Sequence, residues 1–194
     1  MSEIKVNKVS PATGTAITLG DSGDTFTVPS GATIVNSGTA TGFGGGKVLQ
    51  VVGTTKTDQF STTSTSIVTA FSATITPSAS SSKVLVMGHF CMSSTQDANT
   101  PHLYRDTTEI CLGDASGSRT RGLLGSVKYD QTRGRQVTFS FLDSPNSTSA
   151  LVYAIKVASN GAGQQIVVGG TPAGANDVWD GTGTATMNLM EISA

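Results

Sequence analysis

Short stretches in which hydrophobic and polar residues alternate fill most of this chain after residue 46, and a period of two is that of a β-strand. In residues 135–145, for example, Val137 and Phe139 point to one face while Thr138 and Ser140 point to the other. No stretch carries the spacing of an amphipathic helix. Alternation and short apolar runs between turns predict strands at residues 47–52, 66–77, 83–92, 101–106, 108–114, 121–127, 135–145, 150–159, 164–170 and 184–192.

Many short strands separated by turns rich in glycine, proline and asparagine indicate an all-β fold. The number and spacing of the strands predict a two-sheet antiparallel β-sandwich of the jelly-roll type. Residues 101–106 and 108–114 are close enough in sequence to form a tight hairpin. The spacing of strands does not give their order within each sheet.

The stretch KVLVMGHFCM (83–92) is apolar at successive positions, so both of its faces are predicted to be buried. In a sheet protein the cover is a second sheet, a partner subunit, or both. On this interpretation His89, which lies inside the stretch, is a packed core histidine and not a catalytic base.

Residues 13–46 have a different texture, with isolated apolar residues among glycines, threonines and serines. They alternate like very short strands separated by turns at 20–24 and 29–31. Ordering such a segment costs more backbone entropy than its few apolar side chains return on burial. The segment is therefore either disordered or ordered by other chains, and the second case predicts a fibrous homo-oligomer. The candidate stalk-core residues are Ile17, Leu19, Phe26, Val28 and Ile34.

The chain is thus predicted to have three parts. Residues 1–12 form an N-terminal attachment segment, in which Ile4 and Val6 lie in an extended peptide. Residues 13–46 form the Gly/Thr-rich β stalk, which ends in a glycine-rich hinge. Residues 47–194 form the β-sandwich head, which is long enough to bury a core of its own.

Composition and charge exclude several classes of function. Hydrophobic residues make up 37% and charged residues 13%, while Gly (23), Ser (24) and Thr (29) are abundant, which favours β-structure. A net charge of −1 gives no electrostatic reason to bind nucleic acid or anionic lipid. No apolar run approaches the ~20 residues that span a bilayer. The start of the chain lacks a signal peptide, so synthesis in a cytoplasm is expected.

The chain offers little catalytic chemistry. Cys91 and Cys111 are predicted to be buried free thiols, because two cysteines are too few for a disulfide scaffold or a structural zinc site. The sequence contains no nucleophile elbow, zinc-binding helix motif or phosphate-binding loop. Residues 20–24 could suggest a calcium loop, but a plain turn is favoured because the EF-hand spacing is absent. No cofactor or metal is expected.

Four carboxylates, those of Asp106, Glu109, Asp114 and Asp143, could in principle pair for glycoside hydrolysis. Each lies at a predicted strand end or turn, where a solvated carboxylate is ordinary, so a hydrolase is the less favoured interpretation. His102 is predicted to lie at the rim of a sheet, since it begins a strand next to a proline.

Arg119 and Arg121 lie two residues apart in a glycine- and serine-rich loop, so in an extended chain they project to the same side. They are candidate contacts for a carboxylate or phosphate group of a ligand. An ion pair with Asp114, Asp143 or a neighbouring subunit is the preferred alternative. Trp179, the only tryptophan, is a further candidate contact as a stacking platform for sugars.

Several motifs resemble one family of proteins. They are the opening IKVNKVSPATGTAITLGDSGDTFTVPSGATIVNSGTATGFGGG, SSSKVLV (80–86), LYRDTTEICLGDASGSRTRG (103–122), FLDSPNSTSALVYAIKV (141–157) and MNLMEI (187–192). Together they resemble tail-fibre and related virion proteins of marine bacteriophages, which infect cyanobacteria and other ocean bacteria. The resemblance extends over nearly the whole chain.

The resemblance implies a structural virion protein, assembled in the host bacterial cytoplasm as a homotrimer. The N-terminal part would attach to other tail or capsid proteins or form an intertwined stalk. The distal β-sandwich knob would contact a glycan or protein of the host surface. Two alternatives stay open: a capsid or tail decoration or connector protein without receptor contact, and a glycan-degrading tailspike enzyme, which the missing catalytic residues disfavour.

Overall fold

In the computed structural model the described residues are 9–35, 37, 47–95, 99–125, 134–172 and 181–193. The chain divides into two units, Met1–Phe43 and Gly44–Ala194, and each is described by itself. Ten strands and no helix occur among the described residues. The strands are β1 (Val48–Lys56), β2 (Phe60–Thr62), β3 (Val68–Ile75), β4 (Lys83–Ser94), β5 (His102–Arg105), β6 (Thr108–Ile110), β7 (Arg135–Asp143), β8 (Leu151–Val157), β9 (Ile166–Val168) and β10 (Ala185–Ile192).

The all-β prediction for the head is confirmed, and most predicted strands coincide with observed ones. The predicted hairpin is formed by β5 and β6, in which Leu103 pairs with Ile110. Its two-residue turn begins at Asp106, whose φ of 53° is in the left-handed region that such turns require. Two details differ from the prediction. The short strand β2 was not expected, and residues 121–125 of the predicted strand 121–127 are not a strand.

The strand pairing is that of a jelly roll. If the short strands β2 and β9 are set aside, the first remaining strand pairs with the last (β1 with β10), the second with the second-last (β3 with β8), and so on inward through β4 with β7 and β5 with β6. This is the pattern of one long hairpin wound up into two sheets. The larger sheet contains β1-β10-β4, with β7, β9 and β2 attached, and the smaller sheet has the order β3-β8-β5-β6. The predicted sandwich is therefore confirmed.

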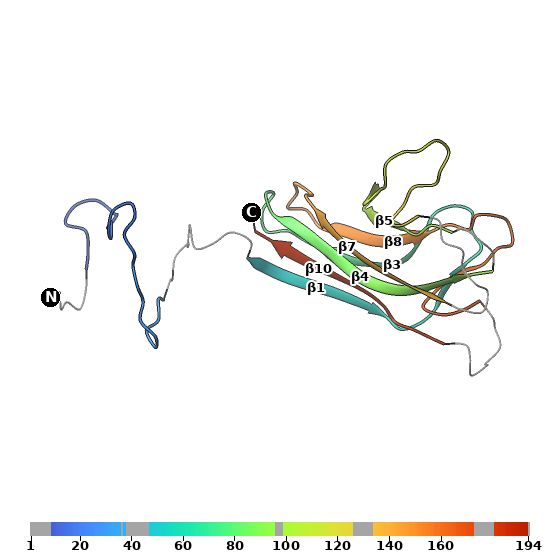
Figure 1. Ribbon diagram of the computed structural model, residues 1–194, viewed down its shortest axis with the longest axis horizontal. Coiled ribbons are helices and arrows are strands. Elements are labelled where there is room, and N and C mark those ends of the chain that lie inside the picture. Colours follow the sequence, from blue (N-terminus) through green and yellow to red (C-terminus); the bar gives the residue numbers. More distant parts are fainter. Residues whose placement is uncertain are drawn as a thin grey trace. The chain divides into compact units, whose positions relative to one another are not determined.

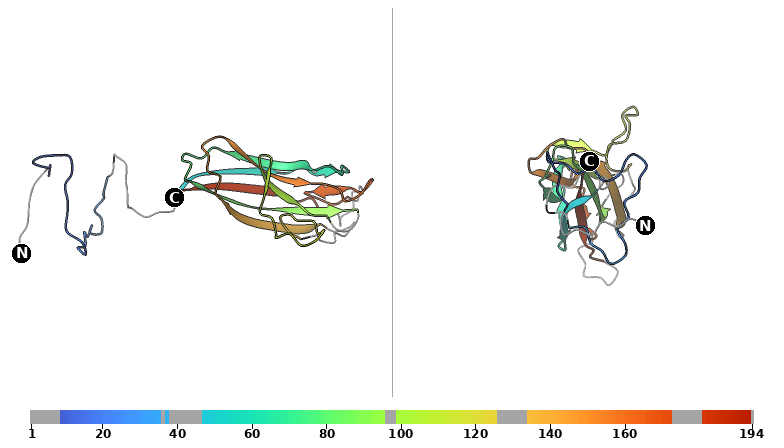
Figure 2. Two further views of the ribbon diagram at one scale, coloured as in Figure 1. Left: turned by 90° about the horizontal axis from the view of Figure 1, so that it is seen from above. Right: turned by 90° about the vertical axis from the view of Figure 1, so that its left-hand side faces the viewer.

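Figures 1 and 2 show the two sheets of the head as two layers. At one end of the sandwich, here named the base, β1 begins and β10 ends, with Val48 paired to Ile192. At this end Gln50 Nε2 donates to the Thr76 carbonyl of the other layer at 2.7 Å. At the opposite end, here named the tip, the Asn160 amide donates to Asn99 Oδ1 at 3.2 Å. The chain enters the head at the base, because the first strand of the head, β1, begins there.

The core lies between the two sheets and takes one face of every long strand. In β4 the inward positions are Val84, Val86, Phe90 and Met92, all fully buried. The smaller sheet contributes inward side chains such as Phe71, whose ring meets that of Phe90 edge-on at 5.8 Å. The remaining buried members include Ile75, Leu103, Val137, Leu151, Tyr153, Ile155, Val157, Ile166, Val168, Ala185, Met187 and Leu189.

A buried carboxylate, that of Asp143, connects the two sheets near the base. Arg105 Nη1 donates to both of its oxygens at 2.7 and 2.6 Å, and the Tyr153 hydroxyl donates to Oδ2 at 2.6 Å. Burial, together with the hydrogen bond to this carboxylate, raises the pKa of Tyr153. The prediction that Asp143 is a solvated strand-end carboxylate was wrong, because β7 turns this side chain inward toward its two partners.

A second buried carboxylate, that of Glu191, lies in the same inward row of the larger sheet, with Val84 between it and Asp143. Gln50 Nε2 donates to it at 2.6 Å, and the Ser78 amide and hydroxyl donate at 2.7 and 2.6 Å. Burial by itself would raise the pKa of Glu191, but these hydrogen bonds outweigh it and lower the pKa to about 2. The base of the core is therefore closed by polar groups whose partners are supplied within the chain.

The described part of the N-terminal unit, residues 9–35 and 37, contains turns and no strand. One turn lies at residues 20–24, where the Asp24 amide donates to the Asp21 carbonyl at 3.0 Å. The other lies at Pro29–Ala32, where the Ala32 amide donates to the Pro29 carbonyl at 3.0 Å. None of the very short strands predicted here forms among these described residues of the single chain.

Candidate functional site

The larger sheet turns one face away from the core, and we name this its outward face. Residues that lie opposite one another on paired antiparallel strands share a face, so the register gives its composition row by row. The rows run from base to tip: Val48–Ile192–Lys83, then Val51–Met190–Leu85–Leu142, then Gly53–Asn188–Met87–Ser140, then Thr55–Thr186–His89–Thr138, then Cys91–Gln136.

The second row is apolar at all four positions, and we name it the basal patch: Val51, Met190, Leu85 and Leu142. Val51 is 57% exposed and Leu142 is 47% exposed, while the two residues between them are half-buried. In the first row, Val48 is also more than half exposed. Apolar side chains thus cross four neighbouring strands without cover from the described part of the head.

The prediction that strand 83–92 is buried on both faces holds for one face within the single chain. The inward face is packed, whereas Leu85, Met87, His89 and Cys91 on the other face are half-buried. His89 is therefore not the core histidine that was predicted, because the alternation that buries Phe90 turns its neighbour outward. Whether a partner subunit covers this face stays a prediction.

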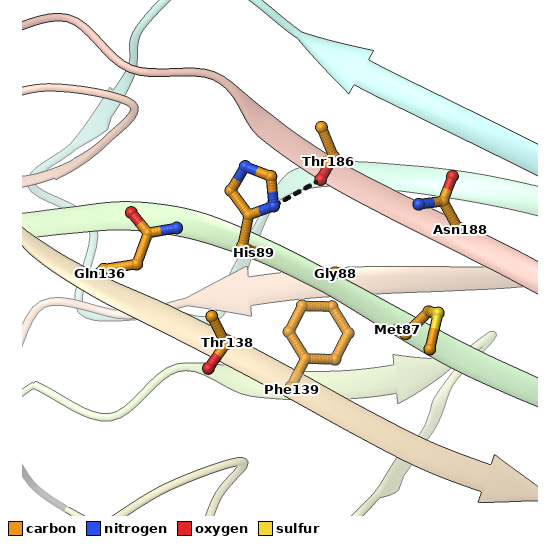
Figure 3. A pocket seen from close by; sticks show the side chains of 8 residues that line it. All are labelled: Met87, Gly88, His89, Gln136, Thr138, Phe139, Thr186 and Asn188. Carbon is orange, nitrogen blue, oxygen red and sulfur yellow. Dashed lines mark hydrogen bonds between the residues drawn. The ribbon is translucent and has the colours of Figure 1, made fainter.

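A shallow groove of about 470 Å³ lies on the half of this face nearer the tip. Figure 3 shows His89 of β4 and Thr186 of β10 pointing toward each other, with 2.9 Å between Nδ1 and Oγ1. Gln136, Thr138 and Asn188 complete its polar lining. The base half of the face is therefore apolar and the tip half is polar but uncharged.

The groove depends on a glycine. A Cβ atom at Gly88 would lie 2.1 Å from the Thr186 carbonyl and 3.0 Å from the Phe139 ring, so no side chain fits there. The absence of a side chain lets β10 and the Phe139 ring approach β4 closely.

In the five rows above, Lys83 in the first row is the one charged residue.

A second, smaller pocket of about 180 Å³ lies at the tip. Its lining is mostly hydroxyl, amide and imidazole groups, and it draws on the ends of several strands and the loops beyond them. Thr100 Oγ1 is buried there without a hydrogen-bond partner. Such a group favours a polar occupant, water included. The lining residues are Thr65, Asn99, Thr100, His102, Thr120, Ala158, Ser159 and Asn160.

His102 is buried in this pocket. The prediction that it lies at the rim of a sheet was wrong. Its Nδ1 lies 2.5 Å from Glu109 Oε1 on the neighbouring strand β6. The loop after β6 covers it, since the Leu123 amide donates to the Pro101 carbonyl at 2.9 Å. A Cβ at Gly122 would lie 2.4 Å from the Thr100 side chain, so this crossing also needs a glycine.

The two candidate arginines lie in that same loop, on either side of pocket residue Thr120, and both are exposed. Arg121 Nε donates to the Gly113 carbonyl at 2.6 Å, which holds the loop to itself. The predicted ion pair between one of these arginines and Asp143 is wrong, because the carboxylate of Asp143 binds Arg105. A role in binding a ligand or a neighbouring subunit stays a prediction.

The other candidate residues have different outcomes. Both cysteines are free thiols, as predicted, but they are half-buried, and burial raises the pKa of each. The candidate attachment residues Ile4 and Val6 and the candidate stacking residue Trp179 lie outside the described residues. Among the residues that are described, no group of three or more His, Cys, Asp or Glu side chains is placed to hold a metal ion. No helix in the described part of the chain is long and apolar enough to cross a membrane.

Sequence reasoning missed the basal patch and the tip pocket. The basal patch left a signal, because Val51 and Leu142 stand out of phase with the inward residues of their strands. The tip pocket left none, since its residues are common loop residues that only the fold brings together.

No protein-family model matches this chain, and no curated protein matches it. Solved structures of infectious bursal disease virus resemble it in part. For the Gx strain the TM-score is 0.39 and the identity 18%, over 75% of this chain and 37% of that one. For the VP2 subviral particle the TM-score is 0.35 and the identity 17%, over 75% and 38%. The match thus spans well under half of the length of those viral chains.

Proposed function

We propose that this chain is a structural protein of a bacteriophage virion, which assembles as a homotrimer through its N-terminal stalk and presents its jelly-roll head to the host surface. One observation carries the proposal. The apolar side chains of the N-terminal segment are exposed in the single chain, with Leu19 at 69%, Phe26 at 70% and Ile34 at 55%. Ile17 and Val28 are also exposed. Burial against other chains would give these side chains a stabilising role.

Three further features support the proposal. The motifs of the head and of the N-terminal segment resemble tail-fibre and related virion proteins of marine bacteriophages. Jelly rolls are also a common architecture of viral capsid and lectin domains, although this is analogy at the level of the fold. The polar pocket lies at the tip, the end opposite to the one where the chain enters the head. An adhesin would place its recognition site there.

The test is the oligomeric state of the full-length protein, measured by light scattering, together with limited proteolysis. The proposal expects a trimer in which residues 13–46 resist cleavage. A monomer whose residues 13–46 are cut rapidly, both free and on the particle, would contradict it.

A decoration or connector protein without receptor contact is the second candidate. The apolar outward face of the larger sheet favours it, because a surface of this kind is typical of proteins packed among neighbours. An electron-microscopy map of the particle separates the two. The adhesin requires an exposed, distal head, whereas the decoration protein requires a head enclosed by other subunits.

We assign no catalytic role to the chain. Asp143 and Glu191, the most deeply buried carboxylates of the described residues, are held by hydrogen bonds that stabilise the core. The assay is incubation with host polysaccharide. Release of reducing ends by the purified protein would establish a tailspike-like hydrolase instead.

A further inference from the structure

We propose that the basal patch is a contact surface between copies of the head. This inference rests on the proposed homotrimer and adds to it the face through which the heads meet. The occupant is a second copy of this chain.

The geometry of the patch suits a flat contact. Its four side chains come from β1, β10, β4 and β7, which are adjacent strands, so the row is roughly 15 Å across at the usual strand spacing. The two outer members, Val51 and Leu142, are the more exposed, at 57% and 47%. An apolar strip of this width, lying in the base half of the outward face, is exposed to water in the single chain.

The charge of the face favours a copy of itself as the partner. Lys83 is the only charged residue of the five outward rows, and it lies at the base edge. Two such faces can meet without burying unpaired charges, and charged residues are depleted from the centres of protein interfaces. A partner that binds through phosphate or carboxylate groups would find little to bind here.

The size of the face is close to what a stable interface needs. β4 and β7 are paired over nine positions, so the face is roughly 30 Å long and 20 Å wide at standard strand dimensions, or about 600 Å². A standard protein interface buries about 800 Å² on each partner. The face therefore provides most of a stable contact, and an association of the N-terminal segments would add to it.

Exposed apolar residues also occur at the start of the head and in the N-terminal segment. Val48 and Leu49, the first residues of β1, are 54% and 47% exposed, and the N-terminal segment has its own exposed apolar residues. The patch lies in the next row of the sheet. If the N-terminal segments join the copies, the bases of the heads are tethered, which raises the effective concentration of one patch for another.

The decisive experiment is photo-crosslinking of the full-length protein. A photoreactive benzoylphenylalanine in place of Leu142 is expected to link chains to one another on irradiation. The matched control has the same group in place of Val152, which is 38% exposed on the outward face of the smaller sheet. Linked chains from the Leu142 site and none from the Val152 site would support the inference. No linked chains from the Leu142 site, or equal yields from the two sites, would overturn it.

Charge substitutions give an independent readout by light scattering over a dilution series. Val51→Lys should weaken the association of full-length chains at least tenfold, whereas Val152→Lys should leave it unchanged. Circular dichroism would verify that both variants fold. A wild-type protein that is monomeric throughout would overturn the trimer and this inference together. A wild-type trimer with both variants unaffected would overturn the inference and leave the proposed function standing.

Discussion

The two sheets of the head present opposite kinds of outward face. On the smaller sheet, Lys156 Nζ lies 4.2 Å from the centre of the Tyr104 ring, and His102 meets Glu109. These four polar side chains have partners within the chain. On the larger sheet, the base half is an apolar row and the tip half is uncharged, with His89 bound to Thr186.

This difference supports the proposal that the larger sheet, and not the smaller one, contacts another copy of the chain. An antiparallel sheet can keep one face in water if that face is polar, and the smaller sheet does so. The larger sheet has a half-exposed apolar face that a lone soluble domain would have little reason to keep. The polar outward face of the smaller sheet is thus suited to contact with water. The outward face of the larger sheet fits the proposed contact with another copy. Four variants test this contrast and the core that supports both faces.

The largest effect is expected from Asp143→Ala, which removes the link between the sheets. It would leave the partly buried Arg105 and the buried Tyr153 hydroxyl without their shared acceptor. We expect unfolding to become easier by about 3 kcal/mol, as for other broken buried ion pairs. Chemical denaturation measures this loss, and Tyr153→Phe, which removes one hydrogen bond only, should cost about 1 kcal/mol. Equal costs for the two variants would mean that the ion pair contributes nothing.

The next effect is that of Glu191→Gln, with a loss on the order of 1–3 kcal/mol at neutral pH. The pKa of Glu191 is about 2 in the folded chain, below its ordinary value of 4.5. The stabilisation by this carboxylate is therefore present above pH 4.5 and is lost as the pH falls from 4.5 toward 2. Melting temperatures across this range should fall for the wild type and less steeply for the variant. Parallel curves would contradict the role of this residue.

A smaller effect is expected from Thr186→Val on the outward face of the larger sheet. The substitution keeps the shape of the side chain and removes the hydroxyl that binds His89 Nδ1. Because one half-buried hydrogen bond is lost, we expect a cost of about 1 kcal/mol. Thermal denaturation measures the cost, with Thr138→Val on the same row as the control. A larger cost at Thr138 would show that the groove is organised differently.

The smallest effect is expected from Lys156→Ala on the outward face of the smaller sheet. It removes the contact of the ammonium group with the Tyr104 ring, which at an exposed site contributes about 0.5 kcal/mol. Light scattering should find the association of chains unchanged, in contrast to Val51→Lys. If Lys156→Ala weakened association instead, the smaller sheet would be the contact face, and the contrast between the two faces would be reversed.

Much of the head could be predicted from the pattern of residues. In strands with one apolar face, such as β7, the alternation gives both the strand and its buried side, so Val137 is inward as expected. In β4 both faces are apolar, and the pattern cannot say which face the second sheet covers. The histidines were misplaced for related reasons. His89 lies on the uncovered face, and His102 is covered by the loop after β6, which folds back over it.

That the head is an all-β sandwich could be predicted from the sequence alone, because period-two patterns and turn residues are local properties of the chain. It also marked the N-terminal segment as too poor in apolar residues to fold alone. Only the tertiary structure decided which residues meet across strands. The row Val51–Met190–Leu85–Leu142 and the link between Asp143 and Arg105 join positions far apart in sequence. The physical reason is that alternation gives each side chain a face, while strand order and register choose its neighbours.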